Sequence, residues 1–184
     1  MIAGRLGGRR LRAPRGRATR PTSDRVREAL FSMLGEMDGA SVLDLFAGTG
    51  ALGIEALSRG AATALFVERD GAAVSALRSN LVELGLAGPL ARVRVGDALS
   101  ALRSARQAGE TYDLVFVDPP YGQARELEPE LSALLPTVLA PGARVVVESD
   151  RRVPAGLPLA VERRKRYGDT TITIHRIEDN DERR

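Results

Sequence analysis

The sequence predicts an α/β protein with a seven-stranded, mostly parallel sheet, an antiparallel hairpin at its C-terminal end and helices on both faces. Three observations support this prediction. Short apolar runs alternate with longer helical patterns along most of the chain, a rhythm typical of parallel βαβ units. Several apolar runs end in glycine or an acidic residue. The last two runs are separated by too few residues for a crossover, so they are expected to pair as a hairpin.

The elements follow in order from these patterns. A helix is expected to begin at Ser23 or Thr22, either of which can cap it, and to continue to about Met37. Strands are expected near 41–46, 63–68, 91–95, 113–118 and 143–149, and helices near 51–59, 71–85, 98–108 and 124–139.

The chain is expected to close with a hairpin. Pro141-Gly142 predicts the turn into the fifth strand, and segments near 157–166 and 170–177 are joined by only three residues. The single histidine, His175, lies in an alternating strand pattern and is expected to be half-exposed.

Composition narrows the function. The 184 residues, 43% of them hydrophobic, suit one domain, for which we expect a basic N-terminal arm or hairpin over 1–22, a folded domain over 23–177 and a flexible acidic tail over 178–184. The absence of cysteine excludes disulfides and a cysteine nucleophile, and a Ser-His-Asp site would require His175. No apolar stretch approaches the roughly 18 residues of a membrane span, so a cytoplasmic protein without a membrane partner is expected.

Asp118-Pro119-Pro120-Tyr121 directly follows the apolar run of residues 114–117. Such a tetrapeptide can hold the amino group of a nucleobase, whose lone pair is delocalised into the ring. The Asp118 carboxylate and the Pro119 carbonyl can each accept one N–H, while the Tyr121 ring stacks on the base. A strand-ending turn is the alternative, because Asp, Pro and Tyr are all common in turns.

A glycine loop follows the apolar strand near 41–46. Gly48, Gly50 and Gly53 match G-x-G-x-x-G, a pattern that also occurs at nicotinamide dinucleotide sites. Asp44, just before the loop, argues against that ligand, because its carboxylate would repel a pyrophosphate. It suits the ammonium group of S-adenosylmethionine, which carries no phosphate.

Two further strand ends carry acidic residues. Glu68 can accept hydrogen bonds from ribose hydroxyls, or it can be a solvated strand end. Asp97 can read an adenine amine, or it can cap the helix that begins after it.

Together these residues resemble class I methyltransferases that act on exocyclic amines. Three segments are similar, more specifically, to the bacterial RsmD-type family. They are Arg20 to Phe31, Asp44 to Ala61, and the tetrapeptide Asp118 to Tyr121. That family methylates guanine N2 in small-subunit (16S) ribosomal RNA. The resemblance implies S-adenosylmethionine as cofactor, no metal, ribosomal RNA or the assembling small subunit as partner, and a monomer.

The resemblance also assigns site residues. Those expected to act on the target base are Asp118, Pro119, Pro120 and Tyr121. Those expected to contact the cofactor are Asp44, Phe46, Ala47, Gly48, Gly50, Glu68, Arg69, Asp97 and Ala98.

The first twenty residues are rich in arginine and glycine and contain no acid. Guanidinium groups suit phosphate contact, so this segment is interpreted as an arm that orders on nucleic acid; a disordered basic leader is the alternative. The residues expected to bind RNA are Arg5, Arg9, Arg10, Arg12, Arg20, Thr22 and Arg25. A second cluster, Arg163 to Arg166, suits a solvated sheet edge as well as an RNA contact.

Three other functions stay open at this point. A DNA amine methyltransferase would use the same tetrapeptide, because no residue identifies the sugar. A nicotinamide-dependent oxidoreductase rests on the glycine pattern alone. A non-catalytic RNA-binding module could retain the same fold.

Overall fold

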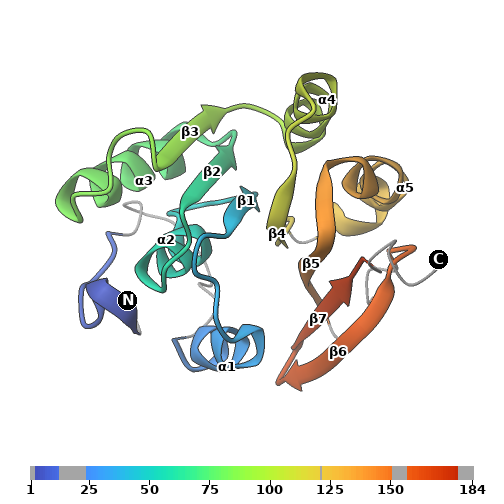
Figure 1. Ribbon diagram of the computed structural model, residues 1–184, viewed down its shortest axis with the longest axis horizontal. Coiled ribbons are helices and arrows are strands. Elements are labelled where there is room, and N and C mark those ends of the chain that lie inside the picture. Colours follow the sequence, from blue (N-terminus) through green and yellow to red (C-terminus); the bar gives the residue numbers. More distant parts are fainter. Residues whose placement is uncertain (1–2, 13–23, 121, 151–156, 178–184) are drawn as a thin grey trace.

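Seven strands form one sheet in the order β3-β2-β1-β4-β5-β7-β6 (Figure 1). The computed structural model describes residues 3–12, 24–120, 122–150 and 157–177. Strands β1 to β5 are parallel, and β7 is antiparallel to both of its neighbours. The sheet predicted from the sequence is thus confirmed. The strands are β1 (Ser41–Leu45), β2 (Thr63–Glu68), β3 (Ala91–Val95), β4 (Tyr112–Val117), β5 (Leu139–Asp150), β6 (Ala160–Tyr167) and β7 (Thr170–Arg176).

Helices cover both faces of the sheet, as expected. Figure 1 shows α1, α2 and α3 on one side and α4 and α5 on the other. The α-helices are α1 (Asp24–Leu34), α2 (Ala51–Ser58), α3 (Gly71–Glu83), α4 (Ala98–Ala108) and α5 (Ala124–Leu134), and two short 3₁₀ turns are η1 (Gly4–Leu6) and η2 (Leu135–Val138).

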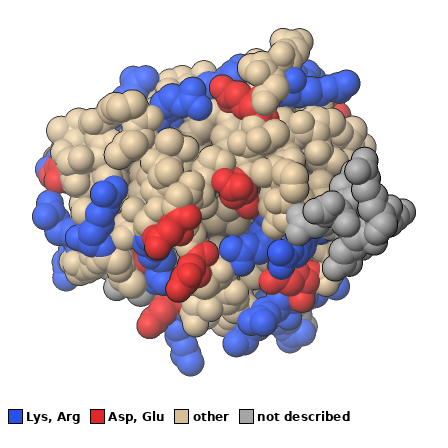
Figure 2. Space-filling model, viewed as in Figure 1, with Lys and Arg blue, Asp and Glu red and all other residues tan. Residues whose placement is uncertain are grey.

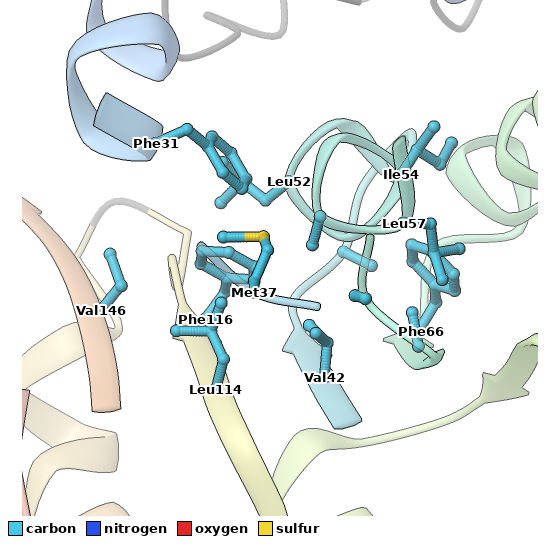
Figure 3. Close-up of a cluster of buried hydrophobic side chains, with 14 of the residues drawn as sticks. Phe31, Met37, Val42, Leu52, Ile54, Leu57, Phe66, Leu114, Phe116 and Val146 are labelled. Atoms are coloured by element: carbon cyan, nitrogen blue, oxygen red, sulfur yellow. The ribbon is translucent and has the colours of Figure 1, made fainter. Parts of the chain in front are cut away.

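The core has two parts, one on each face. Figure 3 shows part of the first, in which side chains from α1 and α2 point toward those of the central strands. The rings of Phe31 and Phe116 lie 5.9 Å apart between their centroids. The second part lies between α4, α5 and the opposite side of the same strands. Burial on both faces explains why β1 and β4 read as nearly continuous apolar runs.

Several element boundaries differ from the prediction. Helix α5 ends at Leu134, where the 3₁₀ turn η2 begins, rather than near 139, and β6 begins at Ala160 rather than near 157. Helix α1 ends at Leu34 rather than at about Met37, because Gly35 adopts a φ of 70° and its N–H donates to the Phe31 carbonyl at 3.1 Å. Strand β5 begins at Leu139, so Pro141-Gly142 lies within the strand as an irregularity in its pairing with β4.

The N-terminal residues 3–12 lie against α2 and α3. Ser58 Oγ donates to the Ala3 carbonyl at 2.6 Å and accepts the Leu6 N–H at 3.0 Å. Arg12 Nε donates to Glu83 at 3.0 Å, and the two side chains form an ion pair. The interpretation of a segment that orders only on nucleic acid is therefore wrong for residues 3–12. The rest of the expected arm, and the expected tail over 178–184, lie outside the described residues.

His175 is buried on β7, where its side chain is only 1% exposed. The expectation of a half-exposed histidine is wrong, because Leu159, just before β6, lies against the imidazole. His175 Nδ1 is 3.1 Å from the Leu159 carbonyl oxygen, and Nε2 has no partner among the described residues. Burial lowers the pKa of His175 below its usual 6.5.

The lowered pKa predicts a loss of stability in mild acid. The unfolded chain binds a proton at His175 near pH 6.5, whereas the folded chain resists protonation. The contribution of this group is therefore fully present above about pH 6.5 and is lost as the pH falls toward the lower folded pKa. As the pH is lowered from 7.5 to 5, the urea midpoint of the natural protein is expected to fall more steeply than that of His175→Gln. Parallel curves would contradict this expectation.

Candidate active site

The glycine loop and the acid-proline segment leave the sheet at the same edge. Strands β1 and β4 are parallel neighbours, with Leu45 opposite Val117. The glycine loop begins directly after Leu45, and Asp118 directly after Val117. The two segments that the sequence predicted to act together are therefore adjacent.

The glycine loop has a backbone shape that few residues tolerate. Gly48 and Gly50 have φ values of 55° and 84°, and Phe46 is a non-glycine residue at 62°. A Cβ on Gly50 would lie 2.4 Å from Leu77 Cδ1. No heavy atom of a described residue lies within 4 Å of a Cβ built on Gly48, so with respect to these residues the loop is closed toward α3 at Gly50 and open at Gly48. Its strained Phe46 is typical of a functional site.

Gly53 fits closely between α2 and the sheet. A Cβ there would lie 2.4 Å from Phe66 Cε1 and 3.1 Å from Asp44 Oδ2. Although alanine favours helices, Gly53→Ala is expected to lower the free energy of unfolding by about 1–3 kcal/mol through overpacking. Chemical denaturation measures this effect. Gly71→Ala is the matched control, because Gly71 also lies in a helix and no atom of the described part of the chain lies within 4 Å of its Cβ. An equal loss in both variants would contradict the close fit.

Asp44 is a buried carboxylate, only 2% exposed, at the end of β1. Its Oδ2 accepts the Gly53 N–H at 2.9 Å. Among the described residues no Lys, Arg or His forms an ion pair with it. Burial, and to a smaller extent the charge of Glu68, raises the pKa of Asp44 to about 7. A cationic group bound beside Asp44 would favour its ionised form.

Glu68, at the end of β2, holds the base of the glycine loop. Its Oε2 accepts the Gly48 N–H at 2.8 Å, and its Oε1 accepts the N–H groups of Arg69 and Asp70, each at 2.8 Å. The interpretation of a merely solvated strand end is therefore wrong. A carboxylate has about four acceptor positions, so Glu68 can hold the loop and still accept a ligand hydroxyl.

A hollow lies over the ends of β2 and β3, beside α4 and α5. Asp97 caps α4, because its Oδ1 accepts the Ser100 N–H at 2.9 Å, and it also lines this hollow. The predicted cap is thus confirmed, whereas the contact with adenine stays a prediction. The lining residues are Phe46, Val67, Glu68, Arg69, Gly96, Asp97, Ala98, Gln123 and Leu127.

Sequence reasoning missed Gln123 and Leu127. Gln123 Oε1 accepts a hydrogen bond from Arg69 at 3.2 Å, which links the end of β2 to the beginning of α5. Both residues follow Tyr121 closely in the chain, and that proximity was the only available signal. Ala47, expected beside the cofactor, is buried and donates its N–H to the Val67 carbonyl at 2.9 Å.

Asp118 lies in an acidic environment at the end of β4. Burial, followed by the charges of Glu148 and Asp44, raises the pKa of Asp118 well above its ordinary value. The Pro120 carbonyl accepts the Gln123 N–H at 3.1 Å, whereas no described residue donates to that of Pro119. The Pro119 carbonyl therefore has capacity to accept a hydrogen bond from a ligand. Tyr121 lies outside the described residues.

Asn80 of α3 connects the glycine loop to the N-terminal segment. Its side chain, 1% exposed, donates to the Thr49 carbonyl at 3.1 Å and to the Arg12 carbonyl at 3.2 Å, and it accepts the Arg12 N–H at 2.7 Å. The backbone of the basic segment is thus fixed close to the loop.

The arginines expected to bind RNA have different surroundings. Arg5, Arg9, Arg10 and Arg25 have exposed side chains, and Arg9 also donates to the Glu83 carbonyl at 3.0 Å. Arg12 is held by Glu83. Arg20 and Thr22 lie outside the described residues.

The sheet order, the antiparallel β7, the glycine loop and the acid-proline segment together define a class I methyltransferase. Within that class, the chain belongs to the family described as Conserved hypothetical protein 95, which it matches over residues 1–176.

The relatives agree with this assignment. Ribosomal RNA small subunit methyltransferase D of Escherichia coli is 43% identical over 160 residues, which cover 86% of this chain and 77% of the relative. The solved structure of yhhF from Escherichia coli is 39% identical, with a TM-score of 0.80 and 97% of each chain covered. An RNA methyltransferase from Salinibacter ruber, solved with S-adenosyl-L-homocysteine, shares the fold at 24% identity, with a TM-score of 0.66 over 86% of this chain and 94% of that one.

Proposed function

We propose that this protein transfers a methyl group from S-adenosylmethionine to the N2 amine of a guanine in small-subunit (16S) ribosomal RNA. One observation carries the proposal: the glycine loop with its buried Asp44, and the Asp118-Pro119 segment, leave adjacent parallel strands at one edge of the sheet. A methyl donor and an acceptor amine bound to these two segments would meet. Identity of 43% to a ribosomal RNA small subunit methyltransferase supports the substrate class.

The residues present fit this cofactor. Asp44 offers a buried carboxylate with no cationic partner among the described residues, which suits the ammonium of the methionine moiety. Glu68 would accept the ribose hydroxyls, and the hollow lined by Phe46, Asp97, Ala98 and Leu127 would take the adenine. A nicotinamide dinucleotide fits poorly, because the buried Asp44 carboxylate would face its phosphates.

The protein supplies positioning and hydrogen-bond acceptors. Once bound, S-adenosylmethionine supplies a sulfonium whose methyl group is already activated for transfer. Asp118 and the Pro119 carbonyl accept the two N–H groups of the amine, which favours the pyramidal nitrogen of the transition state. Tyr121 would stack on the base. The target guanine has to leave its stack to reach them, at a cost of a few kcal/mol unless it already lies in a loop.

The exposed N-terminal arginines would contact the RNA. Arg5, Arg9 and Arg10 lie on a segment whose backbone is fixed to α2 and α3, so they would meet RNA as a preformed surface. Arg25, exposed at the start of α1, would extend that surface, together with Arg20 and Thr22. Arg12 is bound to Glu83 and would have to exchange this partner for a phosphate.

We also propose that residues 23–177 act as one monomeric methyltransferase domain in the cytoplasm, where ribosomal subunits assemble. No helix in the described part of the chain is long and apolar enough to cross a membrane. Sedimentation of the protein with and without RNA tests the oligomeric state.

Methyl incorporation tests the proposed function. The protein would be incubated with labelled S-adenosylmethionine and, in parallel, naked 16S ribosomal RNA, assembled small subunits and duplex DNA. We expect label in one of the ribosomal substrates, recovered as N2-methylguanosine on nucleoside analysis. Label in DNA as methyladenine or methylcytosine would replace the proposal with DNA methylation. Binding of a nicotinamide dinucleotide without binding of S-adenosylmethionine would refute it altogether.

A further inference from the structure

The outer strand β6 carries four consecutive cations at the free edge of the sheet. Arg163, Arg164, Lys165 and Arg166 all have exposed side chains. Glu162 and Asp169 flank the run. Figure 2 shows Lys and Arg gathered over the lower right of the molecule, where Figure 1 places β6, with some acidic side chains among them.

The strand register brings these cations level with the carboxyl ends of the parallel strands, where the active site lies. Val117 of β4 pairs with Val147, Val147 with Thr173, and Thr173 with Arg164. One step further along, Lys165 pairs with Ile172, and Ile172 with Glu148, whose charge acts on Asp118. Arg164 and Lys165 are thus level with the end of β4, three strand spacings away, or about 14 Å.

The sheet order leaves the strand ends on the β4-to-β6 side of the active site for the substrate. The residues that fit the cofactor lie at the ends of β1, β2 and β3. A substrate that reaches Asp118 can therefore extend over β4, β5, β7 and β6 as well as toward the N-terminal arginines. The end of β5 carries Glu148, which repels phosphates. Beyond β5 and β7 lies β6, whose side chains carry the positive charges.

The cations of β6 can bind an anion. Charged side chains protect edge strands, and β6 carries four in series, which alternate between the two faces of the sheet. None forms an ion pair with a described acidic residue. Arg164 Nε donates to Thr173 Oγ1 at 3.4 Å, and Lys165 Nζ lies 5.7 Å from the centre of the Tyr167 ring. Both side chains still have N–H donors for an anion.

We propose that the basic edge, Arg163 to Arg166 of β6, binds the phosphate backbone of the substrate RNA a few nucleotides from the target base. This inference rests on the proposed function. The acidic end of β4 and β5 receives the base amine, and the cations of β6 hold the phosphates that flank it. The acidic ends of β4 and β5 and the cations of β6 together would orient the RNA across the carboxyl ends of these strands.

RNA binding at several salt concentrations tests the proposal. The test variant carries Arg163→Gln, Arg164→Gln, Lys165→Gln and Arg166→Gln. The control removes four exposed cations outside β6, on α3, β3 and α4, through Arg78→Gln, Arg92→Gln, Arg103→Gln and Arg106→Gln. The ligand is a 16S ribosomal RNA fragment that the natural protein methylates. The affinity for S-adenosylhomocysteine and the thermal melt show that each variant is folded.

The basic-edge variant is expected to bind RNA at least tenfold more weakly, with a plot of log affinity against log salt that is flatter by roughly 0.7 for each phosphate that the variant no longer neutralises. Its KM for RNA should rise, while its affinity for S-adenosylhomocysteine stays unchanged. The single variant Arg166→Gln should show the same change on a smaller scale, and it serves if the fourfold variant does not fold.

Three outcomes would overturn the proposal: an unchanged slope and affinity, an equal loss of affinity in the control variant, or a loss of affinity seen with assembled subunits but not with naked RNA. The last would assign the basic edge to a ribosomal protein. A natural protein that methylates no RNA would instead refute the proposed function, so the two failures are distinguishable.

Discussion

Replacing Asp118 with alanine is expected to lower kcat for RNA methylation by at least about 10²-fold while leaving the affinity for S-adenosylhomocysteine nearly unchanged. The reason is that Asp118 accepts an N–H from the amine as positive charge develops on the nitrogen, and removing one preorganised group of this kind costs about 10²–10³ in rate. The cofactor is held by the neighbouring strands and should not respond. Single-turnover methylation and calorimetric binding measure the two quantities separately.

The acidic surroundings of Asp118 add a pH dependence to this prediction. Because burial and the charge of Glu148 raise the pKa of Asp118, the carboxylate is protonated at a higher pH than usual, and a protonated Asp118 is a poorer acceptor. The rate is therefore expected to fall as the pH decreases through this raised pKa. Glu148→Gln removes a like charge and should move the fall to lower pH. An Asp118→Ala variant that methylates at the natural rate would exclude this residue from the mechanism.

Asp44→Asn is expected to weaken binding of S-adenosylmethionine about 10- to 100-fold and, at the same time, to stabilise the cofactor-free protein. The loss of affinity follows from replacing a charge-assisted hydrogen bond to an ammonium with a neutral one, a difference of about 1.5–3 kcal/mol. Calorimetric titration measures the affinity. The same titration of the natural protein between pH 5.5 and 7 should show tighter binding as the pH rises, because Asp44 has a pKa of about 7 and must lose its proton to pair with the ammonium.

The contribution of Asp44 to stability has the opposite pH dependence to that of an ordinary paired carboxylate. The folded pKa of Asp44, about 7, lies above its ordinary value of 3.8, so folding favours the protonated form. Its contribution to stability is present at low pH and is lost as the pH rises toward 7. Asparagine stays neutral and can still accept the Gly53 N–H. The variant should therefore exceed the natural protein in urea midpoint at pH 8 and match it near pH 4.

Asp113→Asn is the matched control, because Asp113 lies at the other end of β4 and accepts the Ser41 N–H at 2.8 Å. It should leave cofactor affinity unchanged. Full affinity in Asp44→Asn, or lower stability than the natural protein at pH 8, would contradict the role of Asp44 as the buried anion of the cofactor site.

The candidate site residues at the strand ends could be predicted from the sequence, because each directly follows an apolar run that marks its strand. The apolar runs of β1 and β4 fixed where each strand stops, and parallel strands place their carboxyl ends at one edge, so Asp44 and Asp118 could be expected together. Gln123 and Leu127 could not, because they reach the hollow only through the turn that follows Asp118 and the position of α5. The cap predicted for Asp97 is confirmed, and the same residue also lines the hollow, but its contact with adenine stays a prediction.

The sequence by itself determined the order of strands and helices, the mixed sheet and the pairing of a glycine loop with an amine-binding segment, because periodicity, turn residues and strand-end chemistry act over a few neighbouring positions. Only the tertiary structure decided the burial of His175, the attachment of residues 3–12 to α2 and α3, and the alignment of the β6 cations with the end of β4. Each of these depends on strand register or on a partner such as Ser58 or Asn80 far away in the chain. Local patterns carry no information about which distant surface a segment meets.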